Sequence, residues 1–201
     1  MEQNYANLSP NHVVSTIAQS RSIRFQKKLC KISSNKYIAK CFIPTRLNRV
    51  LNNLHRLAEG FSNNNQIANR LIQKIVKSGN KFKVLYSNRI IFSSPNGEQL
   101  LMQLRGDFNG ILTFIGILKT YDCMLSRFTL QCLFRNCQGL IHSIIGDHLT
   151  QKSLDRIDFI FNFISDADFL AYMFNSKLTL NRAIIVEIID DLRVLVRDGL
   201  I

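Results

Sequence analysis

The sequence predicts an all-α fold, a single-domain antiparallel bundle of six or seven helices. Apolar residues recur every three or four positions through most of the 201 residues, which is the period of a helix face. No stretch of useful length alternates apolar and polar residues as a strand would. The segments between the periodic stretches are short, which favours antiparallel neighbours. With 46% hydrophobic residues, the chain can bury one substantial core without disulfides or metals.

The N-terminal part is polar and then basic. We expect a disordered tail over residues 1–12, which are rich in asparagine, and a helical domain over residues 13–201. A first helix is expected from about 15 to 40, and its basic residues share one stripe: Arg21, Arg24, Lys27, Lys28 and Lys31. Such a stripe is either a solvated face or a contact for an anion. No acid follows until Glu59, so the mixed charges of a solvated face are missing.

Two more amphipathic helices follow. Pro44 ends the first helix, and Thr45 can cap a second one over residues 46–61. After an asparagine-rich turn, residues 66–86 repeat the pattern and carry a second basic stripe, formed by Arg70, Lys74, Lys77 and Lys81.

The C-terminal half is more apolar. Residues 87–97 contain Pro-Asn-Gly and predict a long loop. Helices are then expected over residues 98–119, 127–149 and 180–197.

The segment 148–174 lies at the centre of the predicted fold. Between Ile157 and Phe174 it carries six aromatic residues, too many for one stripe of a surface helix. Ser165-Asp-Ala-Asp168 has the pattern of a helix N-cap, so we expect two helices that meet at Ser165, with Asp166 and Asp168 as capping acids. Its aromatic side chains either complete a solid core or line a cavity.

Charge and cysteine content indicate the class of partner and the compartment. Residues 1–97 hold 16 lysines and arginines against two acids, whereas residues 98–201 hold 10 against 12. The first half therefore predicts a polyanionic partner, either nucleic acid or an anionic membrane surface. The five cysteines are odd in number and include no C-x-x-C pair, which predicts reduced core residues in a cytosolic protein. We expect no signal peptide and no membrane span.

Motifs for catalysis are missing from the sequence. It contains no phosphate-binding loop, no dinucleotide fingerprint and no nucleophile elbow, so we predict no enzyme and no cofactor. His142 and His148 are six residues apart, a spacing that does not suit a helical metal site, and we predict structural roles for them and no metal. Asp155 and Asp158 fit an exposed helix face.

Several segments carry a family resemblance. His148-Leu-Thr-Gln-Lys-Ser153 is followed by Phe161-Asn-Phe-Ile-Ser-Asp166, and Gln26-Lys-Lys-Leu29, Leu51-Asn-Asn-Leu-His-Arg56 and Asp190-Asp-Leu192 complete the set. In these segments the chain resembles the TIPE family, the tumour-necrosis-factor-α-induced protein 8 group, over about residues 25–201.

This resemblance implies a bundle around an elongated hydrophobic cavity that receives lipid tails. The acyl-chain residues we expect there are Phe108, Ile111, Leu112, Ile115, Phe134, Cys137, Ile141, Ile144, Phe159, Phe163 and Leu170. The family's paired lysines fall on Lys27 and Lys28. The expected headgroup and membrane contacts are Arg24, Lys27, Lys28, Lys31 and Arg89. Ser87 stands where the family has an arginine.

The implied function is phosphoinositide binding or transfer in the control of cell death and immune homeostasis. The expected partners are phospholipids and the anionic inner face of the plasma membrane, reached peripherally from the cytoplasm. An alternative is a helical adaptor that contacts signalling proteins through its surface. Nucleic-acid binding rests on charge alone and has no recognition motif in the sequence.

Overall fold

The computed structural model describes residues 44–93 and 96–199. The predicted tail over residues 1–12 and the predicted basic helix over residues 15–40 lie outside these residues. Four of the expected headgroup residues, Arg24, Lys27, Lys28 and Lys31, therefore lie outside them as well.

The described residues form an all-α bundle, which confirms the predicted fold class. Its seven α-helices are α3 (Thr45–Ser62), α4 (Asn65–Ser87), α5 (Gly97–Leu118), α6 (Met124–Ile145), α7 (Gln151–Ile164), α8 (Ala167–Met173) and α9 (Thr179–Arg197). Two 3₁₀ turns, η1 (Ile90–Ser93) and η2 (Gly146–His148), lie between helices. No strand occurs over residues 44–93 and 96–199.

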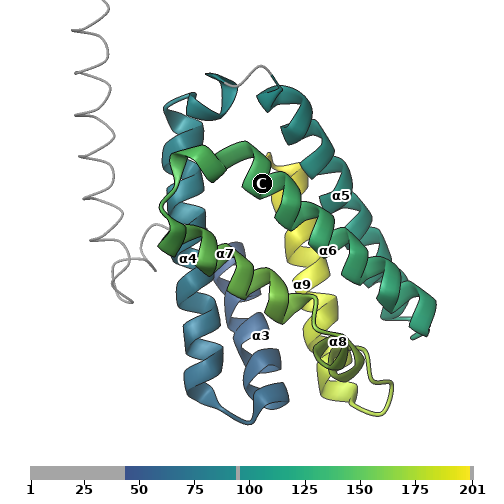
Figure 1. Ribbon diagram of the computed structural model, residues 1–201. Helices are drawn as coiled ribbons and strands as arrows, with labels where there is room; N and C mark the ends of the chain where they lie inside the picture. Colours follow the sequence, from purple (N-terminus) through teal and green to yellow (C-terminus); the bar gives the residue numbers. More distant parts are fainter. Residues whose placement is uncertain (1–43, 94–95, 200–201) are drawn as a thin grey trace, which may run out of the picture.

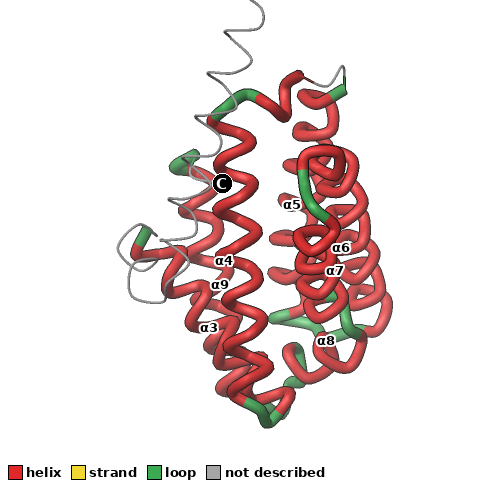
Figure 2. Tube along the Cα trace, turned by 60° about the vertical axis from the view of Figure 1, so that its left-hand side comes forward, coloured by secondary structure: helices red, strands yellow, loops and turns green. Residues whose placement is uncertain are grey.

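The helices form two layers. Figure 2 shows α3, α4 and α9 in one layer and α5 to α8 in the other. Short turns make antiparallel hairpins of α3–α4 and of α5–α6, while α9 returns from the end of the chain to pack along α3 (Figure 1). Helix α7 crosses towards α4, so it joins the two layers.

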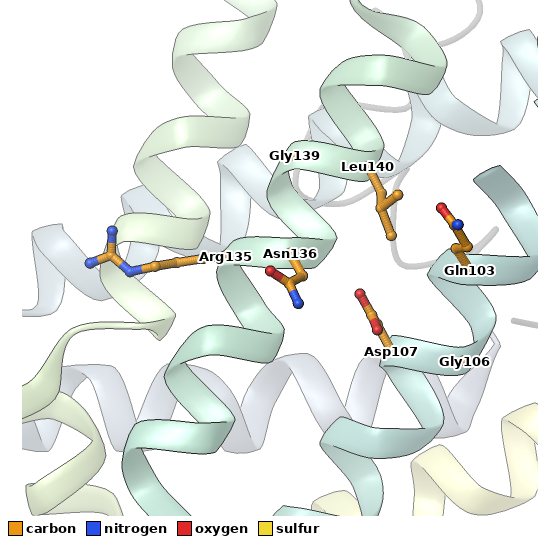
Figure 3. Close-up of a pocket in the computed structure, with 7 residues that line it drawn as sticks. All are labelled: Gln103, Gly106, Asp107, Arg135, Asn136, Gly139 and Leu140. Atoms are coloured by element: carbon orange, nitrogen blue, oxygen red, sulfur yellow. The ribbon is translucent and has the colours of Figure 1, made fainter.

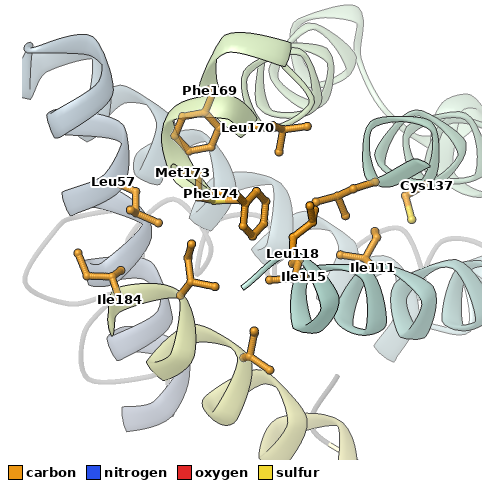
Figure 4. Close-up of a cluster of buried hydrophobic side chains, with 13 residues drawn as sticks. Leu57, Ile111, Ile115, Leu118, Cys137, Phe169, Leu170, Met173, Phe174 and Ile184 are labelled. Atoms are coloured by element: carbon orange, nitrogen blue, oxygen red, sulfur yellow. The ribbon is translucent and has the colours of Figure 1, made fainter. Parts of the chain in front are cut away.

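The buried apolar residues divide into three clusters. The central cluster joins α3, α5, α6, α8 and α9 and holds Leu57, Ile111, Ile115, Leu118, Leu130, Cys137, Phe169, Leu170, Met173, Phe174, Ile184, Ile185 and Ile189 (Figure 4). The second cluster holds Leu85, Ile91, Ile144, Ile145 and Ile157. The third cluster lies between α3, α4 and α7 and holds Ala58, Ala68, Leu71 and Ile160.

The prediction of a long loop over residues 87–97 is partly wrong. This segment contains η1, and Ile91 in this turn is fully buried in the second cluster. Turn-forming residues obscured the short run Ile90, Ile91 and Phe92, of which Ile90 and Ile91 pack in the second cluster. The next predicted boundary also shifts, because α6 starts at Met124 rather than at residue 127 and ends at Ile145, before η2.

The predicted break in the segment 148–174 is confirmed, and so is the predicted capping role of Asp166, whereas the Ser165 hydroxyl is not the cap. Helices α7 and α8 meet at Ser165 and Asp166. Asp166, not Ser165, caps α8, because its carboxylate accepts a hydrogen bond from the Phe169 amide at 2.8 Å. Ser165 is instead buried, and its carbonyl accepts a hydrogen bond from Gln131 at 2.7 Å. At α3, Thr45 is the first helical residue rather than the cap.

His142 and the cysteines have mostly structural surroundings. His142 Nε2 lies 2.7 Å from Asp158 Oδ1, to which Gln138 also donates a hydrogen bond, so α6 is tied to a half-buried Asp158 on α7. The described cysteines are free, as predicted. Burial, with a smaller effect of Asp107, raises the pKa of the buried Cys137 thiol to about 12. Cys123, however, is exposed at the start of α6.

Candidate functional site

A basic surface lies where α4 meets α7, around the ring of Phe159. From α4, Lys74 Nζ lies 4.1 Å and Arg70 Cζ 5.1 Å from the ring centroid. These two cations are four residues apart and therefore share one face of the helix. Both distances suit cation–π contacts, which hold the positive groups over the aromatic face.

A third cation, Arg156 of α7, adds positive charge close to Lys74. The pKa of Lys74 is lowered, first by burial and then by the positive charges of Arg70 and Arg156. Asp155 acts in the opposite direction, but its carboxylate also accepts a hydrogen bond from Gln151 at 2.8 Å. We call Arg70, Lys74, Arg156 and Phe159 the Phe159 site. Its crowded positive charges would be relieved by an anion.

The Phe159 site joins charge to an apolar interior. Phe159 is half-buried and packs against the third cluster, directly beneath the cations. A ligand held there can place an anionic group at the surface and an apolar group against the ring.

The second predicted basic stripe is divided in the structure. Arg70 and Lys74 belong to the Phe159 site, whereas Lys81 contacts the hydroxyl of the buried Ser153 near the start of α7. Thr150 Oγ1 lies 3.0 Å from the same hydroxyl. Lys81 therefore helps to hold α4 against α7.

Arg89 is the one expected headgroup residue that the structure describes. It is exposed, follows the end of α4 and has a positive φ of 56°. Its headgroup role stays a prediction.

The eleven expected acyl-chain residues are distributed over the interior rather than in one cluster. Ile111, Ile115, Cys137 and Leu170 are in the central cluster, with Phe134 packed against it. Ile144 is in the second cluster, with Ile141 beside it, while Phe159 and Phe163 pack against the third. Leu112 is buried and Phe108 is half-buried.

Phe163 is also part of an aromatic group at the α3–α8 contact. Its ring centroid lies 4.9 Å from that of Phe169 and 6.1 Å from that of Phe61. Phe61 also lies 5.7 Å from Tyr172. These four rings therefore pack against one another where α3, α7 and α8 meet.

An open groove of about 670 Å³ lies elsewhere, between α5 and α6. Figure 3 shows its polar lining, which includes Gln103, Asp107 and Asn136, with two glycines and Leu140. This chemistry does not match an acyl chain.

Sequence reasoning missed a buried acid. Asp191 of α9 is 1% exposed and receives Arg46 Nη1 at 3.1 Å and the guanidinium of Arg49, both from α3. These hydrogen bonds, with that of Arg49 first, lower the pKa of Asp191. Four residues away on each helix, the Asn53 side chain of α3 donates a hydrogen bond to the Glu187 carboxylate of α9 at 2.8 Å. The group joins the two helices, and the spacing of Asp191 with Ile184, Ile188 and Leu195 was its signal in the sequence.

Two further kinds of site are absent from the described part of the chain. Over residues 44–93 and 96–199, no three His, Cys, Asp or Glu residues gather as metal ligands. In the same residues, no helix has both the length and the apolarity to cross a bilayer.

Comparison with known proteins agrees with the family resemblance. The family model described as "Tumor necrosis factor alpha-induced protein 8-like" matches residues 17–199. "Tumor necrosis factor alpha-induced protein 8-like protein 1" of Danio rerio is 30% identical over 155 residues, which cover 76% of this chain and 81% of that protein. "Tumor necrosis factor alpha-induced protein 8" of Mus musculus is 29% identical over 170 residues, 83% of this chain and 84% of that protein. The Bos taurus protein of the same name is 27% identical over 158 residues, 79% of each chain.

Proposed function

Because the chain belongs to the tumor necrosis factor alpha-induced protein 8-like family, we propose that it is a phospholipid-binding and transfer protein with phosphoinositides as its preferred class. It acts from the cytoplasm at the inner face of the plasma membrane, in the control of cell death and immune signalling. The names of the relatives, which refer to induction by tumor necrosis factor alpha, support the signalling part. These names describe no enzyme, and we place the function in binding rather than catalysis.

The Phe159 site carries this proposal. Arg70, Lys74 and Arg156 offer several donors to phosphate oxygens, and charge-assisted hydrogen bonds of this kind are stronger than neutral ones. A free phosphate would use only the cations. An amphipathic ligand would also use Phe159 and the third cluster beneath it, so this arrangement favours a lipid over a purely ionic ligand.

For the acyl chains we propose the half-buried apolar residues of the interior. Phe108, Phe134, Ile141 and Phe159 have unburied surface that a methylene chain could cover. Each methylene removed from water contributes about 0.8 kcal/mol.

Vesicle flotation tests the headgroup site. Three vesicle compositions are compared: phosphatidylcholine alone, phosphatidylcholine with phosphatidylserine, and phosphatidylcholine with a phosphoinositide. The two anionic compositions have equal total charge, so a difference between them reports headgroup preference rather than general charge attraction. We expect Arg70→Glu with Lys74→Glu to weaken phosphoinositide-vesicle binding at least about tenfold, since each basic residue near an anionic surface contributes about 1 kcal/mol.

The matched control is Lys83→Glu with Lys177→Glu. Both lysines are exposed and lie outside the Phe159 site, and this pair changes the net charge equally. Loss of binding in both double variants would indicate general charge attraction. Wild-type binding by the Arg70/Lys74 variant would exclude the Phe159 site.

The adaptor alternative rests on exposed apolar residues at the α5–α6 turn. Native mass spectrometry of gently purified protein distinguishes it from lipid binding. A co-purified mass of a phospholipid supports the lipid function, whereas a bare chain with undiminished protein contacts favours an adaptor.

A further inference from the structure

Five large apolar side chains lie exposed where α5 turns into α6. The exposed fractions are 42% for Ile117, 75% for Tyr121, 77% for Met124, 75% for Leu125 and 60% for Phe128. We call these residues the α6 patch. Apolar surface gathered in one place on a folded protein typically marks a contact with another molecule.

The spacing of the α6 patch suits a helical partner. Leu125 and Phe128 lie three residues apart on one face of α6, Met124 lies beside them, and Tyr121 precedes the helix in the turn. The half-buried Cys132 continues the row, and the exposed Arg135 ends it. The seam therefore covers about two turns at the start of α6 and has no partner in the described residues.

Charges near the α6 patch argue for a partner of the same kind. Within residues 117–128, Lys119, Asp122 and Arg127 are charged, and Arg127 Nε lies 3.1 Å from Asp122 Oδ1. This near-balance gives a bilayer or an acidic peptide little electrostatic advantage.

An antiparallel pairing of two α6 helices would cover the exposed apolar face. It would also bring Asp122 and Arg127 of the two copies near one another. If the twofold axis passes near Leu125, Asp122 of one copy faces the region of Arg127 in the other. Twofold contacts use the same patch on both copies, so such exchange is expected of them. Large aromatic side chains present about 150–250 Å² each. Two of the five residues of the α6 patch are aromatic, and the five together supply a substantial part of the area of a standard interface, about 800 Å² per partner.

We propose that a second copy of this chain covers the α6 patch, in a dimer formed by antiparallel packing of the N-terminal halves of α6. This contact goes beyond the proposed lipid binding and does not depend on it. In Figure 1 the α5–α6 turn lies at the far right, whereas α4, which carries Arg70 and Lys74, lies at the left. The dimer therefore leaves the Phe159 site open.

Analytical ultracentrifugation of the full chain over a concentration series tests the dimer. We expect wild-type mass to rise with concentration and Leu125→Glu to weaken the dimer at least about tenfold, as the loss of a central interface side chain does. Met102→Glu is the matched control, because Met102 is 74% exposed and Leu125 is 75% exposed. Met102 lies 15 residues before Ile117 on α5, roughly 22 Å along the helix. Because both side chains are exposed, we expect both variants to keep the wild-type circular dichroism spectrum.

A second measurement locates the contact without a substitution. Cys123 lies within the segment of the α6 patch and is exposed, so pairing should slow its alkylation as protein concentration rises. Peptide mass spectrometry separates Cys123 from the other cysteines.

A monomer at every concentration overturns the proposal, as does a dimer that Leu125→Glu leaves intact. If Leu125→Glu lowers vesicle binding while the wild type stays monomeric, the α6 patch contacts a bilayer instead. Loss of lipid binding in the Arg70/Lys74 variant with an unchanged dimer shows that the two proposals are separate.

Discussion

At the scale of single residues, Asp191 ties two distant helices together. It is a buried carboxylate held by Arg46 and Arg49, whose own side chains are about half exposed. A buried charge requires such partners, because water no longer solvates it. The arginines extend from α3 and Asp191 from α9, so the contact also sets how these helices lie against each other.

Replacement of Asp191 by asparagine should therefore lower the free energy of unfolding. We expect Asp191→Asn to cost about 2 kcal/mol, the contribution typical of hydrogen bonds to a charged group. Asp190→Asn, at the exposed neighbouring position, is the control and should change stability little. Urea denaturation followed by circular dichroism measures both. An equal effect of the two substitutions would mean that the buried ion pair contributes nothing.

The same carboxylate makes stability depend on pH. The arginines hold the pKa of Asp191 below its ordinary value of about 3.9. Below about pH 4 the unfolded chain takes up a proton that the folded chain still refuses, so its contribution is present above this pH and is lost as pH falls towards the folded pKa. Wild-type stability should therefore fall more steeply than that of Asp191→Asn between about pH 4 and pH 2. Parallel curves in thermal denaturation would contradict this.

At the scale of elements, the start of α5 depends on a glycine. A Cβ at Gly97 would lie 2.0 Å from the backbone carbonyl oxygen of Ile91. Ile91 is buried in the second cluster, so η1 cannot easily move away. The close approach of these two backbones fixes the connection between α4 and α5.

We expect Gly97→Ala to destabilise the protein by about 2 kcal/mol, within the range for overpacked sites. Gly79→Ala is the contrasting change, since nothing lies within 4 Å of a Cβ there. Gly79 is inside α4, and alanine should raise stability by about 0.5–1 kcal/mol through helix propensity. Thermal denaturation of both variants tests the pair. A stable Gly97→Ala protein would show that η1 can shift freely.

Helical periodicity predicted the elements well and their contacts poorly. The spacing of Leu47, Val50, Leu54 and Leu57 is enough to place α3, because amphipathic spacing is a local property. The placement of Phe159 under Arg70 and Lys74 needs the relative position of α4 and α7, which no local pattern contains. Ile91 was missed because a buried 3₁₀ turn is too short to show a period. Asp191 showed its burial by spacing, but its partners on α3 are 142 and 145 residues away.

At the scale of the whole molecule, charge is divided unevenly along the chain. The N-terminal half is strongly basic, and the C-terminal half is slightly acidic. The elements mix these halves in space, since α4 packs against α7 and α3 against α9. At the α3–α9 contact the bases of one half meet an acid of the other, while at the Phe159 site basic residues of both halves meet.

Binding to anionic vesicles should consequently weaken with salt. The Debye length falls from about 10 Å at 0.1 M to about 3 Å at 1 M, which screens exposed cations from a charged surface. We expect at least about a tenfold loss of vesicle affinity over this range. Flotation with uncharged vesicles is the control and should vary little. Salt-independent binding would assign the contact to apolar residues.

The three-part core implies that stability is unevenly distributed. The third cluster has only four buried members, two of them alanines, and the larger residues around it are partly exposed, whereas α9 is fixed by the thirteen buried residues of the central cluster. Amide hydrogens of α4 near Leu71 should therefore exchange through local opening at a lower free energy than those of α9 near Ile189. Such an opening would separate α4 from α7 at Phe159 and leave the rest of the bundle folded. It would give the lipid of the proposed function a way in without global unfolding.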